Sequence, residues 1–408
     1  MGKPTIRFEG YTDDWEQRKL GELGSLKNGM NFSKEAMGIG FPFVNLQNIF
    51  GNNVIDVTNL GKAMASDSQL KDYNLLNGDV LFVRSSVKLE GVGEAALVPQ
   101  NLENTTYSGF IIRFRDEYGL DNNFKRFLFG IESVRNQIMA QATNSANKNI
   151  SQTVLENLCL KIPNKSEQEK IGLYFSDIDH LITLHHRKCE ETKKLKKFML
   201  QKMFPKKGEK VPDIRFDGFT DDWEQRKLSE ISDVRDGTHD SPSYLSDGHP
   251  FVTSKNVKDG YINYDDVQYI SDEDFEAINK RSKVDMNDIL MGMIGTIGNL
   301  ALIRTEPDFA IKNVALIKDT KQVSYMYLYH YLQSSSAERQ LLSGLDGGTQ
   351  KFVSLKNIRE LNIMVPSEAE QLKVGNFIES LDHLITLHQH KCEELQNIKK
   401  FMLQNMFT

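Results

Sequence analysis

Two long stretches of the chain, Ser166–Phe204 and Ser367–Phe407, carry apolar or small residues at steps of mainly three and four. This spacing is typical of helices that pair in coiled coils. The stripe comprises Ile171, Ile178, Ile182, Cys189, Met199 and Met203 in the first stretch, and Val374, Ile378, Leu381, Ile385, Cys392, Leu395, Met402 and Met406 in the second, with His185, Thr192 and His388 on the same stripe. A helix of this length extends on the order of 60 Å, too far to hide its stripe in one small domain. We therefore predict that the two helices pack against each other, as an antiparallel pair.

Residues typical of a helix N-terminus occur at the start of both stretches. Ser166 is followed by Glu169, and Ser367 by Glu370, the spacing of a capping box. Pro163 lies just before the first stretch, and prolines commonly mark such a boundary.

The rest of the chain has short strand-like runs, such as Asp79–Val83 and Asp288–Met291, separated by Gly, Asn and Asp. We read each such segment as an α+β domain with a curved or barrel-like sheet. Helices are expected over Asn123–Gln141 and Ser324–Ser343. The predicted organisation is domain one over 1–163, a helical spacer over 164–210, domain two over 211–366 and a second helical spacer over 367–408.

The chain also repeats itself. Trp15–Leu20 recurs as Trp223–Leu228, an offset of 208 (223 − 15), and Asp179–His185 recurs as Asp382–His388, an offset of 203 (382 − 179). A period this long indicates two domain-sized copies rather than a solenoid. The domain entries and long helices are nearly identical, whereas the interiors diverge. We infer that both copies bind something common through the helices, and that each interior binds something different.

The order of segments yields one more expectation. Residues Lys207–Leu228 follow the first long helix, whereas their copy, Lys3–Leu20, has no helix before it. We expect Lys3–Leu20 to lie beside the end of the second helix near Phe407, so that the two ends of the chain are close.

The amino-acid composition narrows the class of protein to which the chain can belong. Hydrophobic residues make up 39% and charged residues 26% of the chain, as in soluble globular proteins. No apolar run approaches the roughly 18 to 20 residues that span a bilayer, and no secretory signal is apparent. The three cysteines form no disulfide framework, which fits a cytoplasmic protein. The net charge of −6 argues mildly against nucleic acid as a partner, although local basic patches matter more than the sum.

The duplicated architecture, the Trp15–Leu20 entry and the Phe198–Phe204 helix end, repeated as Phe401–Phe407, resemble the specificity subunit of type I restriction–modification enzymes. The resemblance covers essentially the whole chain. It implies two target recognition domains separated by the helical pair, each reading one half of a split, asymmetric site in double-stranded DNA. It also implies two methyltransferase subunits, which use S-adenosylmethionine, and ATP- and Mg²⁺-dependent restriction subunits as partners. The chain itself would bind no cofactor or metal and catalyse nothing.

Matched polar segments of the two copies are the candidate DNA contacts, because Asn, Gln, Arg and Lys read base edges or bind phosphates. In the first domain we select Lys27, Asn28, Asn31, Asn45, Gln47, Arg84, Ser85, Lys88, Asn144, Asn147, Lys148 and Asn149. In the second domain we select Arg235, Thr238, His239, Lys255, Asn256, Thr296, Lys312, Thr349, Gln350 and Lys351. Gly29 and Gly237 suggest tight turns in two of these segments.

Two other functions stay open. Asp308 with Asp319 and Lys321 loosely matches the metal signature of a nuclease, which would make the chain a stand-alone, metal-dependent endonuclease. A protein-interaction scaffold without DNA binding is the other, supported by the net negative charge.

A possible zinc set is formed by His185, Cys189, His388 and Cys392. These residues lie on the apolar stripe, however, where a packing role is expected. The chain has no phosphate-binding Gly-rich loop and no Asn-Pro-Pro-aromatic motif of adenine methyltransferases.

Overall fold

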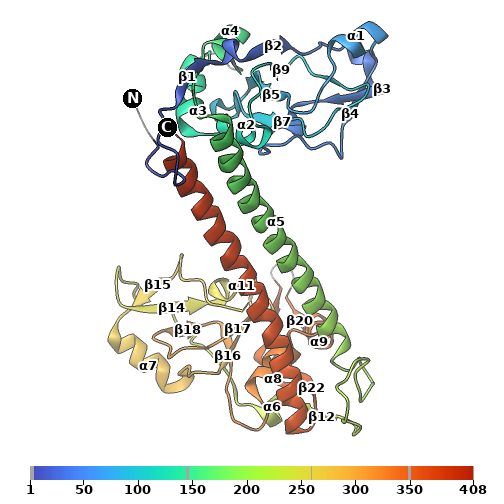
Figure 1. Ribbon diagram of the computed structural model, residues 1–408. Helices are drawn as coiled ribbons and strands as arrows, with labels where there is room; N and C mark the ends of the chain where they lie inside the picture. Colours follow the sequence, from blue (N-terminus) through green and yellow to red (C-terminus); the bar gives the residue numbers. More distant parts are fainter. Residues whose placement is uncertain (1–3, 144–146, 259, 348–350, 408) are drawn as a thin grey trace. The chain divides into compact units, whose positions relative to one another are not determined.

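The computed structural model describes residues 4–143, 147–258, 260–347 and 351–407. It divides into two compact units, one formed by Met1–His185 with His390–Thr408 and the other by His186–Gln389. Each unit contains one copy of the mixed segment together with part of each long helix, so the division falls inside both helices (Figure 1).

Unit 1 is built on two sheets. The four-stranded sheet is antiparallel, in the order β2 (Gly24–Asn28), β9 (Ile111–Asp116), β5 (Val80–Val83) and β7 (Ala95–Leu97). The three-stranded sheet has the order β4 (Gly61–Ala63), β3 (Met37–Val44) and β8 (Thr106–Tyr107), with β3 and β8 parallel.

Unit 2 has the same plan although the sequences of the interiors differ. Its four-stranded sheet has the order β13 (Val234–Asp236), β19 (Val314–Ile317), β16 (Ile289–Gly292) and β17 (Leu300–Leu302). Its three-stranded sheet has the order β15 (Gln268–Ile270), β14 (His249–Thr253) and β18 (Ala310–Lys312), again with one parallel pair. Where the sequence predicts a curved or barrel-like sheet, each unit has a four-stranded and a three-stranded sheet. Isolated bridges link them, Met30 to Ser108 and Thr238 to Lys312.

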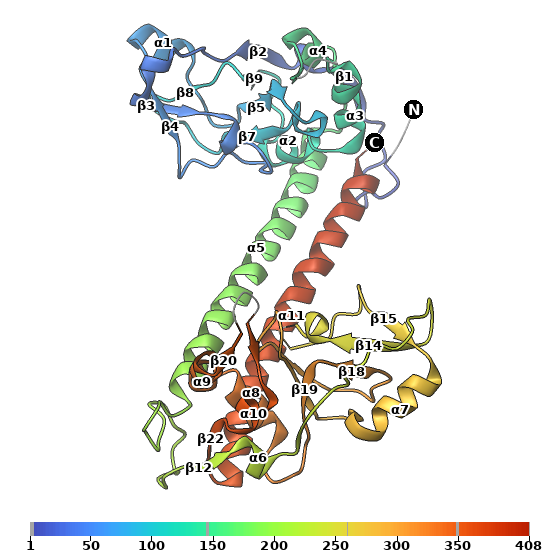
Figure 2. The same ribbon diagram turned by 180° about the vertical axis from the view of Figure 1, so that it is seen from behind.

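Shorter elements complete the units. Two-stranded pairs form between β1 (Glu16–Lys19) and β11 (Cys159–Ile162), β6 (Ser85–Ser86) and β10 (Lys148–Asn149), β12 (Glu224–Lys227) and β22 (Asn362–Val365), and β20 (Leu345–Asp346) and β21 (Phe352–Val353). Short helices are α1 (Asp67–Asp72), α4 (Gln152–Glu156), α6 (Leu228–Ile231), α7 (Asp272–Ser282) and α10 (Leu355–Arg359). Single 3-10 turns cover Leu20–Glu22, Lys34–Ala36, Leu46–Asn48, Leu89–Gly91 and Ser254–Asn256. Figure 2 shows α7 beside β18 at the edge of the three-stranded sheet.

The expected helix over Asn123–Gln141 is wrong in one respect, because it is two helices, α2 (Asn122–Leu128) and α3 (Glu132–Gln141). Ile131, at the start of α3, has an extended backbone, which interrupts the helical hydrogen bonds. The expected helix over Ser324–Ser343 is likewise two helices, α8 (Tyr325–Leu332) and α9 (Ser335–Ser343). Here Ser334 is the extended cap residue, and its hydroxyl accepts a hydrogen bond from Ala337 N.

The two long helices are present as α5 (Lys165–Lys202) and α11 (Glu368–Met406). The predicted capping box of α5 is wrong, because the helix begins one residue before Ser166 and the Asn164 side chain accepts a hydrogen bond from Glu167 N. In α11 the Glu370 carboxylate instead binds the Arg215 guanidinium.

Within each unit, α5 and α11 lie side by side and run in opposite directions, as predicted (Figure 1). In unit 1, Lys399 on α11 pairs with Asp179 on α5 at 2.5 Å, and Cys392 Sγ lies 3.6 Å from the Ile182 carbonyl. In unit 2 the roles are exchanged, since Lys196 on α5 pairs with Asp382 on α11 at 2.7 Å. The repeated Asp and Lys positions thus form the same contact twice.

The entry segments lie where the order of segments predicts. Ile6 N donates to Asn405 O at 3.0 Å, and Trp15 packs edge-on to Phe407 with ring centroids 6.2 Å apart. In unit 2 the copy of this arrangement joins Ile214 N to Lys202 O and Trp223 to Phe204. The start of the described chain therefore lies at the C-terminal end of α11.

A buried ion pair accompanies each entry segment. Arg7 binds both carboxylate oxygens of Glu167, at 2.6 and 2.8 Å, and Arg215 binds both of Glu370, at 2.7 and 2.9 Å. The Glu167 and Glu370 side chains are fully or almost fully buried. Bidentate geometry of this kind fixes the orientation of the guanidinium against the carboxylate and also strengthens the ion pair. It anchors each entry segment to the first turn of a long helix.

Each unit has its own core. The side of the four-stranded sheet that faces the helices packs against α2, α5 and the end of α11 in unit 1, and against α8, α11 and the end of α5 in unit 2. Of the described helices, none combines the length and apolar character that crossing a membrane requires.

Candidate nucleic-acid interface

In unit 1, backbone hydrogen bonds bring separate candidate segments together. Met30 N donates to Tyr107 O at 2.9 Å, and Arg84 N donates to Phe110 O at 2.8 Å. Strand β10 pairs with β6, which places Lys148 opposite Ser86 and Asn149 opposite Ser85. The segments that contain Lys27–Asn31, Arg84–Lys88 and Lys148–Asn149 therefore meet around the loop before β9.

Unit 2 repeats the convergence with other side chains. Thr238 N donates to Ile311 O at 3.1 Å, and the Ser254 hydroxyl donates to Asn313 O at 2.6 Å while accepting from Met293 N. Val353 N donates to Met293 O at 3.0 Å, which brings the segment that begins at Lys351 to the same place.

Two glycines permit this close packing. A Cβ on Gly29 would lie 2.1 Å from Ser108 O, and one on Gly237 would lie 2.3 Å from Ile311 O. Each glycine is therefore required because strands approach closely, rather than because of the tight turn that the sequence suggested.

Several selected cations already have partners. Lys27 pairs with Asp72 at 2.5 Å and Lys255 with Asp266 at 2.9 Å, and Arg235 pairs with Asp233 at 2.6 Å. Surface ion pairs of this kind contribute about 0–1 kcal/mol, so a phosphate can replace the carboxylate. Lys312 donates to the Ser241 hydroxyl at 2.5 Å.

Other selected basic side chains have no carboxylate partner in the described structure, so their charge can contact DNA. Among the described residues no carboxylate pairs with Arg84, Lys88, Lys148 or Lys351, and Lys88 and Lys351 are exposed. Arg84 is half-buried and reaches Gly109 O at 3.4 Å.

The structure corrects the interpretation of Asn256, whose side chain is buried. Its oxygen accepts from Thr253 N and its amide donates to Asn263 O, so it cannot also reach DNA. Its counterpart Asn48 closes the first domain's loop in the same way.

Two further selected residues, Asn45 and Thr296, have a structural contact as well. Asn45 Oδ1 accepts from Gln47 N, and the Thr296 hydroxyl donates to Ser254 O. The Asn28 side-chain oxygen is buried without a hydrogen-bond partner among the described residues. Gln47 and Asn31 are exposed, as are Asn147 and His239, whereas Ser85, Asn149 and Thr238 are half-buried. Asn144, Thr349 and Gln350 lie outside the described residues.

The sequence interpretation did not select Ser254 or Phe110, and it gave Asn313 only as a weaker candidate beside Lys312. Asn313 has a positive φ of 51°, and its Oδ1 accepts a hydrogen bond from His239 Nδ1 at 2.7 Å, while the other ring nitrogen of His239 lies 3.0 Å from Asp236. Phe110 is an exposed aromatic residue in the loop before β9. Its only sequence signal is a large apolar residue directly after Ser-Gly, in an otherwise polar loop.

The alternatives find little support in the geometry. The Asp308 carboxylate is bonded to His249 Nδ1 at 2.6 Å, and the Asp319 carboxylate pairs with Lys321. Neither carboxylate belongs to a group of described His, Cys, Asp and Glu residues arranged to hold a metal ion. The Cys189 and Cys392 thiols each contact a backbone carbonyl of the opposite helix, as expected for packing positions.

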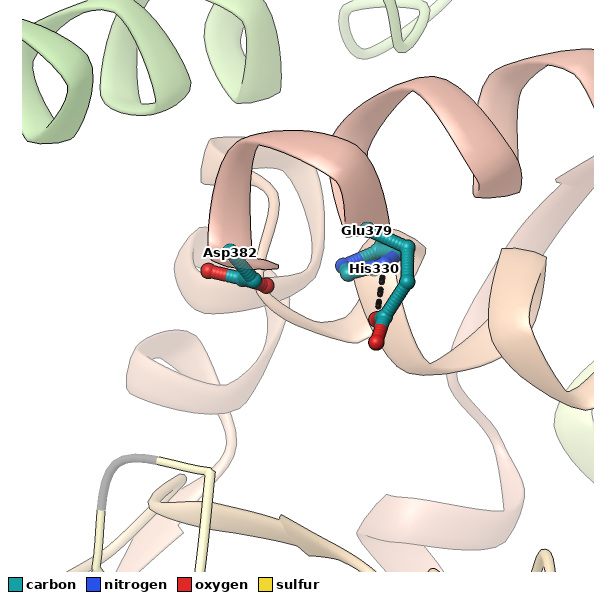
Figure 3. Close-up of side chains that lie close together, drawn as sticks. All are labelled: His330, Glu379 and Asp382. Atoms are coloured by element: carbon teal, nitrogen blue, oxygen red, sulfur yellow. Dashed lines mark ion pairs between the residues drawn. The ribbon is translucent and has the colours of Figure 1, made fainter. Parts of the chain in front are cut away.

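One cluster with metal-ligand residue types does occur, formed by His330 on α8 with Glu379 and Asp382 on α11 (Figure 3). Both carboxylates already have cationic partners, since Arg304 pairs with Glu379 at 2.7 Å and Lys196 with Asp382 at 2.7 Å. We therefore assign the cluster to packing between α8 and the long helices.

The His330 ring is fully buried, and burial lowers its pKa because the charged imidazolium loses its hydration. Its Nε2 lies 3.4 Å from Glu379, and contacts with His330 and Arg304 lower the pKa of that carboxyl to about 2. Folding thus favours neutral His330, so its contribution to stability is complete above the unfolded pKa of about 6.5 and is lost as the pH falls below it.

Phe127 stands at the place of His330 in unit 1. Replacing His330 with Phe should therefore remove this loss of stability at acidic pH. We expect the urea midpoint of the wild-type chain to fall between pH 7.5 and 5.5, and that of His330→Phe to fall less. His383→Asn, which changes an exposed histidine on α11, is the control and should keep the wild-type slope. Equal slopes for His330→Phe and wild type would contradict the assignment.

The comparisons with known proteins agree with this architecture. The family model for the type I restriction modification DNA specificity domain matches residues 12–194 and 220–397. The MjaX protein of Methanocaldococcus jannaschii, which bears the name of a type I restriction enzyme specificity subunit, is 25% identical over 414 residues, 97% of this chain and 93% of that protein. The MjaVIII specificity subunit of the same organism is 24% identical over 284 residues, 66% of each chain.

Among solved structures, the S subunit of a type I restriction–modification system from M. genitalium has the same fold. Its TM-score is 0.60 at 19% identity, covering 100% of this chain and 99% of that one. Since the family model matches both copies and most of the sequence, the chain belongs to the family of type I restriction–modification DNA specificity domains.

Proposed function

We propose that this chain is the sequence-specific DNA-recognition subunit of a type I restriction–modification complex. Residues 1–163 and 211–366 are its target recognition domains, and 164–210 and 367–408 are the helical spacers. Each domain reads one half of a split, asymmetric site, and the chain itself catalyses nothing. One observation carries this function: two domains of the same topology present different side chains on the same converging loops.

The partners follow from the duplication. Two copies of one methyltransferase subunit, which uses S-adenosylmethionine, require the same docking surface twice. Restriction subunits that use ATP and Mg²⁺ join for cleavage. A protein that reads chromosomal DNA in a bacterial or archaeal cell acts in the cytoplasm.

The long helices offer such a repeated surface. Unit 1 exposes Leu181, Ile398 and Phe401, and unit 2 exposes their counterparts Leu384, Leu195 and Phe198. Each set combines both helices, and each position recurs at the offset of 203. Single exposed apolar residues are ordinary on protein surfaces. A set of three that recurs in both units at the same offset supports a binding surface.

Replacing Phe198 or Phe401 with Ser should therefore remove one methyltransferase copy each. We expect complexes purified after co-expression to change from two copies per chain to one, and the double variant to lose both. Mass photometry measures this stoichiometry. Met286→Ser, at an exposed apolar residue outside the two long helices, is the control and should keep two copies. Two copies in both single variants would contradict this surface.

The DNA-reading role is tested on the assembled complex. Arg84→Ala should weaken binding to the cognate duplex by about 1–3 kcal/mol if Arg84 reads a base, and should relax specificity in one half-site alone. Fluorescence anisotropy with duplexes mutated in either half measures both effects. Lys161→Ala, on β11 away from the converging loops, is the control. Equal affinity of wild type and Arg84→Ala for all duplexes would remove Arg84 from the interface.

A further inference from the structure

An apolar groove lies among the candidate DNA contacts of the first domain. Its volume is about 480 Å³, and its walls are Leu46, Phe50, Val87 and Phe110. Val87 is 77% exposed and Phe110 59% exposed. Large side chains this exposed, inside a region of polar loops, are costly to leave in water and suggest an apolar ligand.

The groove is held in shape by its own backbone. Phe110 is fixed from both sides, since its carbonyl accepts from Arg84 N at 2.8 Å and its N donates to the Ser108 hydroxyl at 3.3 Å. On the opposite wall, Phe50 N donates to Leu46 O at 3.0 Å. A Cβ on Gly91 would lie 2.5 Å from Ser86 Oγ and 3.1 Å from the Phe50 ring, so the floor of the groove is closely packed.

The second domain lacks this apolar character at the same places. Phe110 directly precedes β9, and its counterpart before β19 is Asn313. Phe50 follows the buried Asn48 by two residues, as Lys258 follows Asn256. The groove is therefore a feature in which the two domains differ, as expected of a determinant that reads one half-site and not the other.

The charges around the groove favour a base over a phosphate. Lys88 lies at its rim and can contact the neighbouring DNA backbone. Glu90 and Glu94 also line the groove, and Glu94 accepts a hydrogen bond from Gly51 N at 2.9 Å. Their negative charge disfavours a phosphate inside the groove, which leaves the edge of a base.

Only one base presents an apolar group in the major groove, and that group is the C5-methyl of thymine. We infer that the first domain reads a thymine in its half-site by placing this methyl group between Phe110 and Val87. The inference rests on the proposed function, because it assumes that these loops face DNA. It names the base type that the first half-site contains.

Deoxyuridine tests this directly, because it differs from thymidine by the methyl group alone. In the assembled complex, with duplexes carrying the methylated motif, each thymine is replaced singly by deoxyuridine. We expect one position in the half-site of the first domain to raise Kd about three- to tenfold. Phe110→Asn, which copies the second domain, should bind the thymine and uracil duplexes equally. Deoxyuridine in the other half-site is the control, and its effect should be the same in wild type and variant.

Val87→Ser provides a second variant at a highly exposed residue and should also reduce the discrimination. No sensitivity to deoxyuridine in the first half-site, or unchanged sensitivity in both variants, would overturn the inference while the proposed function stands. A loss of methyltransferase copies in Phe110→Asn, without a change in discrimination, would also overturn it and identify the groove as a protein-docking site. If no cognate motif exists, the proposed function itself fails.

Discussion

Arg215→Met is expected to lower the free energy of unfolding of unit 2 by about 3–5 kcal/mol. The substitution leaves the Glu370 carboxylate, which is 1% exposed, without its bidentate partner. An uncompensated buried charge is costly, and the Arg215 segment also loses its anchor to the start of α11.

A double variant separates the cost of the unpaired Glu370 charge from the loss of packing around Arg215. In Arg215→Met with Glu370→Leu no charge remains, so most of the stability should return. Arg7→Met is the matched substitution in unit 1, where Glu167 is fully buried. Because Trp15 and Trp223 lie in different units, single-tryptophan variants report each unit separately during urea unfolding. A loss below about 1 kcal/mol in Arg215→Met would show that the pair is only a surface contact.

Lengthening both long helices by one heptad is expected to abolish methylation of the native target. The duplicated residues are Ile182–Lys188 in α5 and Ile385–Lys391 in α11, so the apolar stripe and the antiparallel pairing keep their phase. Seven residues add about 10.5 Å, roughly the rise of three base pairs. Any motif that the variant still methylates should keep both half-sites and contain a longer spacer.

The matched control duplicates the heptad in α5 alone. This variant brings Lys196 out of step with Asp382 and should fail to assemble with its partners. Single-molecule sequencing of methylated DNA measures the motif in each strain. An unchanged spacer in the double insertion would show that the helices do not set the distance between half-sites.

The long helices and the entry segments were predictable because their signals are local or repeated. The apolar stripe alone predicts α5 and α11, and the order of the repeats places Lys3–Leu20 beside Phe407, as the Ile6–Asn405 hydrogen bond confirms. The break after α2 was not predictable, because apolar residues continue through Phe129 and Ile131 and tertiary packing decides where the helix ends. The break after α8 has a local signal, since Ser334 is a typical cap residue and its side chain caps α9.

The candidate site is harder to predict because it depends on contacts between distant segments. Asn256 and Lys255 are adjacent in sequence, yet the Asn256 side chain is buried against Asn263 whereas Lys255 is exposed. The sequence also selects polar residues for DNA contact and so passes over Phe110. Its place in the groove depends on Arg84, 26 positions away (110 − 84), through one backbone hydrogen bond.

Genome-wide adenine methylation in otherwise identical cells with and without this chain tests the central claim most directly. The account predicts that deletion removes methylation from one split, asymmetric motif, and that re-expression restores it. Arg84→Ala should affect only one half of that motif. Methylation that is the same at every motif with and without the chain, in cells whose methyltransferase subunit is expressed, would contradict a role in DNA recognition.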